Sequence, residues 1–174
     1  LFYDTNSWAV VADDGELFWM VNALTTSNMY PYSYRRLLGD KATIRTKFPR
    51  ENIMANYIRD SVKCTVNATT GVVKFYKFED EPIINTWAEI YPSLFVDASD
   101  MPSGVRAHLQ YPLQFFHRQF DDVYKAYHMR NPLDYFNMED LWDDCDEVLG
   151  PIRDKGDAVT FSFEPFQWVA DTGD

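Results

Sequence analysis

Two β-hairpin signals constrain the fold of this chain more than any other feature. Asp13-Asp14-Gly15 and Ala68-Thr69-Thr70-Gly71 are turn sequences, and each lies between runs rich in β-branched and aromatic residues. The flanking runs are Trp8 to Ala12, Glu16 to Leu24, Tyr57 to Asn67 and Val72 to Phe78. Asp-Gly between apolar runs is a strong hairpin signal, and near alternation is typical of half-buried strands. The sequence therefore predicts an antiparallel sheet built from two hairpins.

The second half of the chain predicts helices. Glu79-Asp80-Glu81-Pro82 supplies acidic residues and an early proline, which suit the start of a helix running to about Tyr91. Asp100-Met101-Pro102 introduces a short helix to about Leu109, and Pro112 opens a longer one. In this longer helix apolar residues recur at three or four residues and oppose a polar face. The apolar face is Leu113, Phe116, Phe120, Val123 and Tyr127, and the polar face is Gln114, Arg118, Asp121, Asp122 and Lys125.

The remaining segments complete the fold prediction. Thr25 to Arg50 has weak periodicity and several polar residues, so we expect mostly loop around a short turn at Tyr34 to Leu38. Pro132 to Trp142 favours a short helix, Asp143 to Asp157 an acidic loop, and Ala158 to Phe163 a closing strand. Strands, then helices, then a strand indicate the α+β class. We predict one domain over residues 1–174, with a mostly antiparallel sheet of two hairpins plus a closing strand, packed against about three helices.

Composition narrows the classes of partner. The formal net charge is -11, so the surface should repel nucleic acid and anionic lipid head groups. We therefore expect no nucleic-acid partner. No stretch reaches the roughly 18 consecutive apolar residues that a membrane helix requires, so we do not expect this chain itself to span a membrane. It begins with Leu-Phe-Tyr rather than Met, as a piece of a longer protein would.

Cys64 and Cys145 are too few for a disulfide scaffold or a four-ligand zinc site. The sequence leaves open whether they pair. Cys64 lies in the alternating run Val62-Lys63-Cys64-Thr65-Val66, on the same side as the two valines, which indicates buried packing.

One loop has the composition of a recognition surface. Its candidate binding residues are Tyr30, Tyr32, Tyr34, Arg35 and Arg36. Tyrosine and arginine are enriched among the residues that contribute most to protein binding. One interpretation is docking to a partner protein or to a membrane-embedded part of the same protein. The alternative is that the tyrosines close one end of the core while the arginines balance nearby acids.

Metal and catalytic signals are compositional. Asp143, Asp144, Asp146 and Glu147 supply oxygen ligands for a weak calcium site, although they lack the spacing of a calcium loop. We predict no other cofactor. His117 and His128 would lie roughly 16 Å apart along one helix, which disfavours a shared metal.

For catalysis, Ser103 beside Gly104, with His108 nearby, only weakly resembles a nucleophile site, so we assign no catalytic residues. A hydrolase that uses paired acidic residues stays open as an alternative, because such pairs meet in space rather than in sequence.

Three blocks carry a family resemblance. They are Asp14 to Ser33, Asn56 to Lys63, and a run from His108 through Tyr127-His128-Met129 to Tyr135 to Trp142. Together they resemble Uncharacterised Protein Family 0182 (UPF 0182), a group of large bacterial and archaeal integral membrane proteins. The chain departs from the pattern that this resemblance leads us to expect at Asn22, Leu24, Asn67 and Gln110, where Asp, Tyr, Asp and Arg are expected.

The resemblance implies a parent with N-terminal transmembrane helices and a large soluble region that contains this chain. It implies no catalytic residues. Two functional interpretations follow. The first is an extracytoplasmic interaction or ligand-sensing domain of a polytopic protein of the cell membrane, docking to its own transmembrane region or to another protein. The second is a hydrolase domain, and we favour the non-enzymatic interpretation.

Overall fold

The computed structural model describes residues 1–38, 53–143, 145–151 and 158–162; residue 5 and residues 146–151 and 158–162 are described by their backbone alone. Contacts divide the chain into two compact units, Leu1–Phe115 and Phe116–Asp174. Each unit contains strands that pair within it. These two units do not test the expectation of a single domain over residues 1–174, which stays a prediction.

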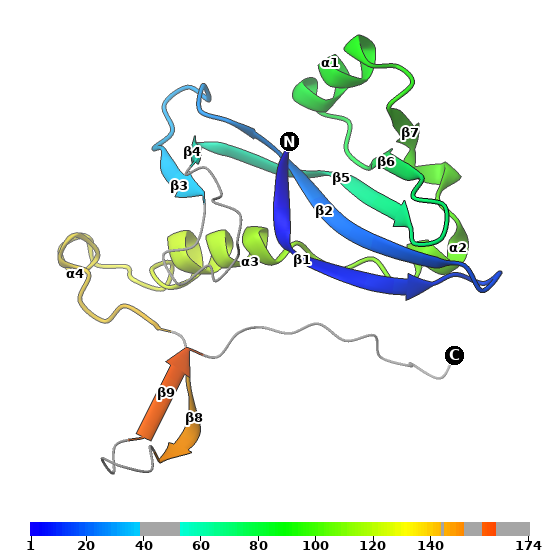
Figure 1. The fold of residues 1–174 in the computed structure, drawn as a ribbon. Coiled ribbons are helices and arrows are strands. Elements are labelled where there is room, and N and C mark those ends of the chain that lie inside the picture. The colour runs from blue at the N-terminus through cyan, green and yellow to red at the C-terminus, as the bar shows by residue number, and fades with distance from the viewer. Residues whose placement is uncertain (39–52, 144, 152–157, 163–174) are drawn as a thin grey trace. The chain divides into compact units, whose positions relative to one another are not determined.

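Five strands form the main sheet of the first unit, in the order β1-β2-β5-β6-β7 (Figure 1). They are β1 (Phe2–Val11), β2 (Leu17–Ser27), β5 (Tyr57–Asn67), β6 (Val73–Lys77) and β7 (Phe95–Asp97). The first four strands pair antiparallel, and β7 lies parallel to β6. The predicted α+β class and both predicted hairpins are confirmed, whereas the three-residue strand β7 was not predicted.

The hairpin turns explain three residues of the sequence. Gly15 and Gly71 have φ angles of 83° and 72°, a left-handed conformation that glycine adopts without a steric penalty. Beside the second turn, the Asn67 side-chain oxygen accepts hydrogen bonds from two turn amides, at 3.0 and 2.8 Å, while its Nδ2 donates to Glu16 at 2.8 Å. An ionised aspartate has no donor for Glu16, so asparagine suits this position better.

Helix α1 (Pro82–Ile90) connects β6 to the parallel strand β7, because parallel neighbours need a crossover connection. Pro82 occupies the first turn, where its missing N–H costs no hydrogen bond. Glu81 is the N-cap, and its carboxylate accepts hydrogen bonds from the amides of Ile83 and Ile84, both at 3.0 Å. The predicted helix from the Glu79 to Pro82 segment to about Tyr91 is confirmed.

Both faces of the sheet are covered. Successive side chains of a strand point to opposite faces, so Met20 and Ala23 of β2 belong to different cores. One core joins Met20 to Val10, Ala12, Tyr76, Met101 and Val105. The other joins Ala23 to Val62 and to Ile84 of α1. This coverage explains why β5 is buried along most of its length rather than at alternate residues only.

A second, two-stranded sheet corrects the prediction of a loop between Thr25 and Arg50. β2 continues to Ser27, and β3 (Arg36–Leu38) pairs antiparallel with β4 (Ile53–Ala55). Leu38 and Ala55 pack in one core cluster with residues of β1 and β2. Each strand has only three residues, which is too short for a periodic signal, and the pairing joins distant parts of the chain. Residues 39–50 of the predicted loop lie outside the described residues.

Two short helical elements follow β7, the 3-10 turn η1 (Ala98–Asp100) and helix α2 (Ser103–Arg106), and Val105 of α2 lies in the core. The predicted short helix is confirmed, with an earlier end. Gly104 lies against the first hairpin turn, and a Cβ added there would be 2.8 Å from the backbone nitrogen of Asp13. Any larger residue would therefore separate α2 from this turn.

The predicted long helix begins as expected but changes its geometry midway. α3 (Leu113–Gln119) is followed by a single π-helical turn, η2 (Phe120–Tyr124). Gln114, predicted on the polar face, is buried, because the buried Asp4 of β1 accepts hydrogen bonds from the amides of Leu113 and Gln114, at 2.6 and 3.3 Å. The start of α3 is thus fixed to the first unit.

The predicted apolar face of this helix is not a buried stripe. Val123 and Tyr127 are 60% and 63% exposed. The rings stack along the helix instead: Phe120 lies 6.3 Å from Phe116 and 5.2 Å from Tyr124 between centroids. Aromatic residues four apart on a helix contact one another without a covering layer, which sequence periodicity alone does not distinguish from burial.

The rest of the second unit contains α4 (Pro132–Asn137), β8 (Asp146–Pro151) and β9 (Ala158–Ser162). The short helix predicted after Pro132 and the strand predicted from Ala158 are confirmed. The acidic loop predicted over residues 143–157 is wrong for residues 146–151, which form β8. β9 pairs with β8 in a separate two-stranded sheet, so it does not close the main sheet as predicted.

Candidate interaction site

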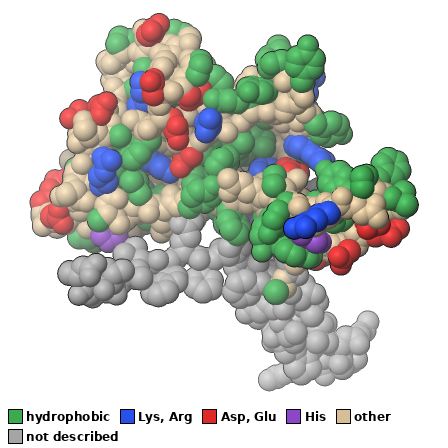
Figure 2. Space-filling view, turned by 180° about the vertical axis from the view of Figure 1, so that it is seen from behind, with side chains coloured by type: hydrophobic (Ala, Val, Ile, Leu, Met, Phe, Trp, Pro, Cys, Tyr) green, Lys and Arg blue, Asp and Glu red, His purple; other side chains and the backbone are tan. Residues whose placement is uncertain are grey.

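Tyr30 to Arg36, which we call the tyrosine loop, follows β2 and leads into β3. Tyr32 is fully exposed, with a relative accessibility of 109%, and Tyr34 is 78% exposed. Hydrophobic side chains are exposed among charged ones elsewhere too, as one face of the molecule illustrates (Figure 2). The tyrosine loop differs from these other residues because its large aromatic side chains lie in solvent while hydrogen bonds fix its backbone.

Asn56, between β4 and β5, fixes this backbone. Its Nδ2 donates to the carbonyl oxygens of Tyr30 and Ser33, at 2.8 and 3.1 Å, and its Oδ1 accepts from the amide of Tyr30 at 3.0 Å. The amide of Asn56 itself donates to the Ser27 carbonyl at 2.9 Å. The Asn56 side chain thus binds both ends of the segment from Tyr30 to Ser33. The backbone conformation of this segment, which carries Tyr32, is therefore set by the fold itself.

Tyr32 has a φ of 57°, in the left-handed region that a bulky residue rarely adopts. Such a conformation costs on the order of 1–3 kcal/mol and persists only where surrounding contacts enforce it. The bonds from Asn56 to Tyr30 and Ser33, on either side of Tyr32, provide that enforcement. This backbone conformation directs the Tyr32 side chain into solvent.

A chain of contacts links the tyrosine loop to helix α1. The Tyr30 ring stacks on Tyr57 with 5.8 Å between centroids, and the Tyr57 hydroxyl donates to Glu81 at 3.1 Å. Ser61 also donates to Glu81, at 3.2 Å, in addition to the two α1 amides. Burial alone would raise the pKa of Glu81, but bonds from the backbone of Ile83 and Ile84 and from the Thr25 and Tyr57 side chains lower it below its ordinary value. Glu81 is therefore a buried, ionised anchor.

Three arginines flank these tyrosines. Arg35 donates through Nε to the Asn28 carbonyl at 3.0 Å. The Arg36 guanidinium lies over the Tyr34 ring, 4.9 Å from its centroid. Arg59 of β5 is exposed and follows Tyr57 closely along the strand; burial raises the pKa of the Tyr57 hydroxyl, and the nearby Arg59 opposes the rise. The structure thus brings the predicted binding residues together, and it adds Arg59 to them.

A second polar cluster lies inside the sheet. Lys63 donates to Asp60 at 2.6 Å and to Asn22 at 2.7 Å, and its side chain is only 6% exposed. Residues three apart on a regular strand point to opposite faces, but β5 carries one extra residue opposite Leu24, so Asp60 and Lys63 can meet. Asn22 Nδ2 and Asp60 Oδ1 are buried without a hydrogen-bond partner among the described residues.

Burial disfavours the charged forms of both ionisable side chains in this cluster, Asp60 and Lys63. Burial raises the pKa of Asp60 and lowers that of Lys63, and in each case the partner charge opposes the shift. Both groups are therefore easier to neutralise than in water. The lysine tip is enclosed, which suits internal structure better than reaction with a substrate.

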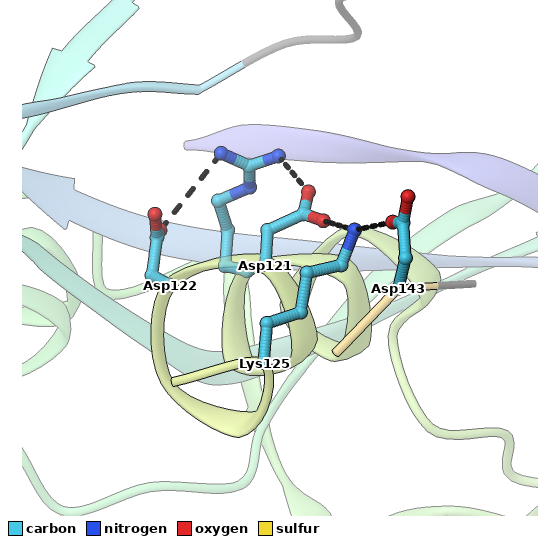
Figure 3. Close-up of polar contacts among 5 residues, drawn as sticks. Asp121, Asp122, Lys125 and Asp143 are labelled. Atoms are coloured by element: carbon cyan, nitrogen blue, oxygen red, sulfur yellow. Dashed lines mark hydrogen bonds and ion pairs between the residues drawn. The ribbon is translucent and has the colours of Figure 1, made fainter. Parts of the chain in front are cut away.

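The predicted calcium ligands do not form a described metal site. Asp143 is exposed and accepts a hydrogen bond from the Lys125 ammonium group at 2.7 Å, and this group also lies 3.5 Å from Asp121 (Figure 3). Arg118 completes this ion-pair cluster with Asp121 and Asp122, at 3.0 and 3.9 Å. Asp144 and the side chains of Asp146 and Glu147 lie outside the described part of the chain. A calcium site at these four residues stays a prediction.

The histidine and serine candidates have structural contacts. The Nδ1 of His108 lies 2.7 Å from the Gly104 carbonyl, while Ser103 donates to Asp13 at 2.9 Å. His128 stacks on Trp142 with 4.1 Å between centroids. Among the described residues no group of three or more His, Cys, Asp or Glu side chains is placed to hold a metal.

Both cysteines are free thiols, with Cys64 buried and Cys145 exposed. Burial raises the pKa of Cys64 to about 11, so its thiol stays protonated at neutral pH. The interpretation of Cys64 as a packing residue is confirmed. No disulfide joins it to Cys145.

Sequence reasoning identified the exposed members of the tyrosine loop but missed Asn56, Tyr57 and Arg59, which hold or extend it. Tyr57 and Arg59 lie at the start of β5, opposite the end of β2, and Asn56 directly precedes them. The available signal was positional: residues that begin one strand of an antiparallel pair lie beside the loop that leaves the other strand.

Comparison with known proteins gives a family match over residues 1–166, to a family described as "Uncharacterised protein family (UPF0182)". A UPF0182 protein of Desulforamulus reducens is 39% identical over 86% of this chain and 15% of its own length. A UPF0182 protein of Methanospirillum hungatei is 37% identical over 95% of this chain and 17% of its own length. The chain thus spans about a sixth of these relatives. No solved structure matches it significantly.

Proposed function

The chain belongs to the uncharacterised protein family UPF0182, and from this premise we propose that it is an interaction domain whose tyrosine loop docks onto a protein partner. The partner is another protein or the membrane-embedded part of its own, longer parent, on the extracytoplasmic side of the cell membrane. The resemblance to a family of membrane proteins supports the membrane location. Within the described residues, the structure contains no helix with the length and apolarity needed to cross a bilayer.

One observation carries this proposal: Tyr32 and Tyr34 are exposed on a backbone that Asn56 already holds in its final conformation. A flexible loop must lose conformational entropy when it binds, and a fixed loop has lost it on folding. Tyrosine adds a large amphipathic surface with few rotatable bonds. A fixed loop of exposed tyrosines therefore has the properties of a recognition surface.

Site-specific photo-crosslinking in cells that express the full-length protein tests this proposal. A photoreactive phenylalanine analogue replaces Tyr32 or Tyr34, and mass spectrometry identifies the residues that it captures. The same analogue at Val11, an exposed residue of β1, is the control. We expect one recurrent captured segment from positions 32 and 34, and none of that segment from position 11.

Asn56→Ala should reduce the yield of this crosslink, because it releases the loop without removing the crosslinking side chain. If positions 32 and 34 capture the same diffuse products as position 11, the tyrosine loop is not a docking surface and the proposal is wrong.

A further inference from the structure

We propose that the segment recognised by the tyrosine loop is acidic, with carboxylates that pair with Arg35 and Arg59 beside the exposed tyrosines. This inference rests on the proposed function, since it names the chemistry of the partner for the same surface. It commits to a short stretch of protein rich in Asp or Glu. Anionic lipid surfaces are the alternative that the experiment below distinguishes.

The charge distribution of the chain indicates that the tyrosine loop favours an acidic partner. The net charge is -11, yet the described residues 28–38 contain two basic residues, Arg35 and Arg36, and no acidic residue. Both arginines lie on the tyrosine loop and are exposed. Exposed Arg59 of β5 adds a third guanidinium beside Tyr57. The tyrosine loop is therefore a basic region of an acidic molecule.

Among the described residues, the carboxylate linked to this loop does not neutralise it from the surface. Glu81, the carboxylate linked to the loop through Tyr57, is buried and already accepts bonds from α1 amides and hydroxyl groups. The contact recorded for Arg35 is with a neutral carbonyl, that of Asn28. A guanidinium carries five N–H donors in a planar fork that matches a carboxylate, so one such bond leaves it able to bind a second acceptor.

The acidity of the rest of the chain decides between the two kinds of anionic partner. Charges interact over about 8–10 Å at physiological ionic strength, so a short acidic segment senses mainly the local arginines. An extended anionic surface such as a bilayer would also face the acidic remainder of the molecule and be repelled. A short protein segment thus fits the surface better, and its aliphatic groups can pack on Tyr32 and Tyr34.

The test is a titration of the ¹⁵N-labelled chain with a synthetic peptide that alternates glutamate and glycine, followed by amide chemical shifts. A lysine-glycine peptide and vesicles of phosphatidylglycerol are parallel probes. We expect saturable shifts confined to the amides of residues 28–36 and 56–59, with the glutamate peptide only. The shifts should weaken as salt is added, because the pairing is electrostatic.

Variants locate the binding. Arg35→Gln combined with Arg59→Gln should weaken binding of the glutamate peptide about tenfold, the loss expected for charge-assisted bonds. Lys74→Gln, which removes an exposed charge from β6, is the matched control and should bind as the unaltered chain does. An unchanged amide spectrum away from the loop confirms that the double variant is folded. Arg35→Lys with Arg59→Lys keeps the charge and should restore part of the affinity.

Each remaining outcome overturns the inference. These outcomes are no shift with the glutamate peptide, equal shifts with the lysine peptide, shifts outside the loop, or binding of vesicles but not of peptide. If the glutamate peptide fails while crosslinks from positions 32 and 34 persist in cells, the partner is not acidic and the docking function stands. If the crosslinks are also absent, both proposals fall.

Discussion

At the scale of single residues, Asn56 decides the shape of the candidate site. It makes three side-chain hydrogen bonds to the backbone of the tyrosine loop. A typical hydrogen bond contributes about 0.5–1.5 kcal/mol, and less where water competes. We expect Asn56→Ala to lower the free energy of unfolding by about 1–2 kcal/mol and to speed amide hydrogen exchange in residues 29–34.

Asn137→Ala is the matched control, because Asn137 also donates a side-chain hydrogen bond but lies on α4, outside the loop. Its exchange rates in residues 29–34 should equal those of the unaltered chain. Unchanged exchange in the loop of Asn56→Ala would contradict the role assigned to Asn56.

The buried Lys63 gives a second prediction at this scale. Removing one partner of a buried ion pair leaves an uncompensated charge, which costs roughly 3–5 kcal/mol. Lys63→Met should therefore destabilise the chain strongly in urea unfolding, because Asp60 and Asn22 lose their common donor.

Replacing both charges, as Lys63→Met with Asp60→Leu, should recover much of that loss, since no charge is left buried. A double variant as unstable as the sum of the two single variants would contradict the coupling between Lys63 and Asp60.

At the scale of secondary-structure elements, the cap of α1 predicts a dependence on pH. Hydrogen bonds hold the pKa of Glu81 below the ordinary 4.5 despite burial. A group with a lowered folded-state pKa stabilises the protein above its unfolded pKa, and this contribution is lost as pH falls through the folded-state value. Glu81→Gln should thus cost about 0.5–2 kcal/mol at neutral pH, the usual effect of losing a cap.

The stability difference between Glu81→Gln and the unaltered chain should shrink below pH 4.5, measured by urea unfolding across a pH series. Glu89→Gln, an exposed change in the same helix, should show no comparable pH dependence. A difference that stays constant down to the lowest pH would show that the charge of Glu81 does not stabilise α1.

Some secondary-structure elements could be predicted from the sequence and others could not. Hairpins and α1 depend on local patterns: turn glycines, alternation, and a proline after acidic residues. The three-residue strands β3, β4 and β7 depend on pairing with distant partners, which leaves no local pattern. The exposed rings after α3 have the same spacing as a buried stripe, so their stacking was not predictable.

The candidate site divides in the same way. Its exposed tyrosines and arginines were predictable from composition, because recognition surfaces favour these residue types. The residues that hold them were not. Asn56 reads as an ordinary turn residue, and its role depends on the antiparallel register that places it beside Ser27.

At the scale of the whole molecule, an acidic chain carries a basic, aromatic loop. We expect the loop's fixed backbone to favour binding, its arginines to select acidic partners, and the negative remainder to discourage association with other polyanions. The internal Lys63 cluster and the Glu81 cap hold strands β2 and β5 and helix α1, on which the loop depends. The strands that carry these buried polar groups are thus the same strands that position the tyrosine loop.

Docking of the tyrosine loop can be measured as the alkylation rate of a cysteine placed at Tyr32. The background is Cys145→Ser, since Cys145 is exposed, whereas Cys64 is buried with a pKa of about 11 and reacts too slowly to interfere. Tyr32→Cys and the reference Val11→Cys are each labelled in the isolated chain and in the full-length protein in its own cells.

We predict that the cysteine at position 32 reacts rapidly in the isolated chain and at least about tenfold more slowly in cells, where a docked partner covers it. Position 11 should react at similar rates in both settings. If position 32 is as accessible in cells as position 11, the tyrosine loop faces solvent there and the proposed docking function is wrong.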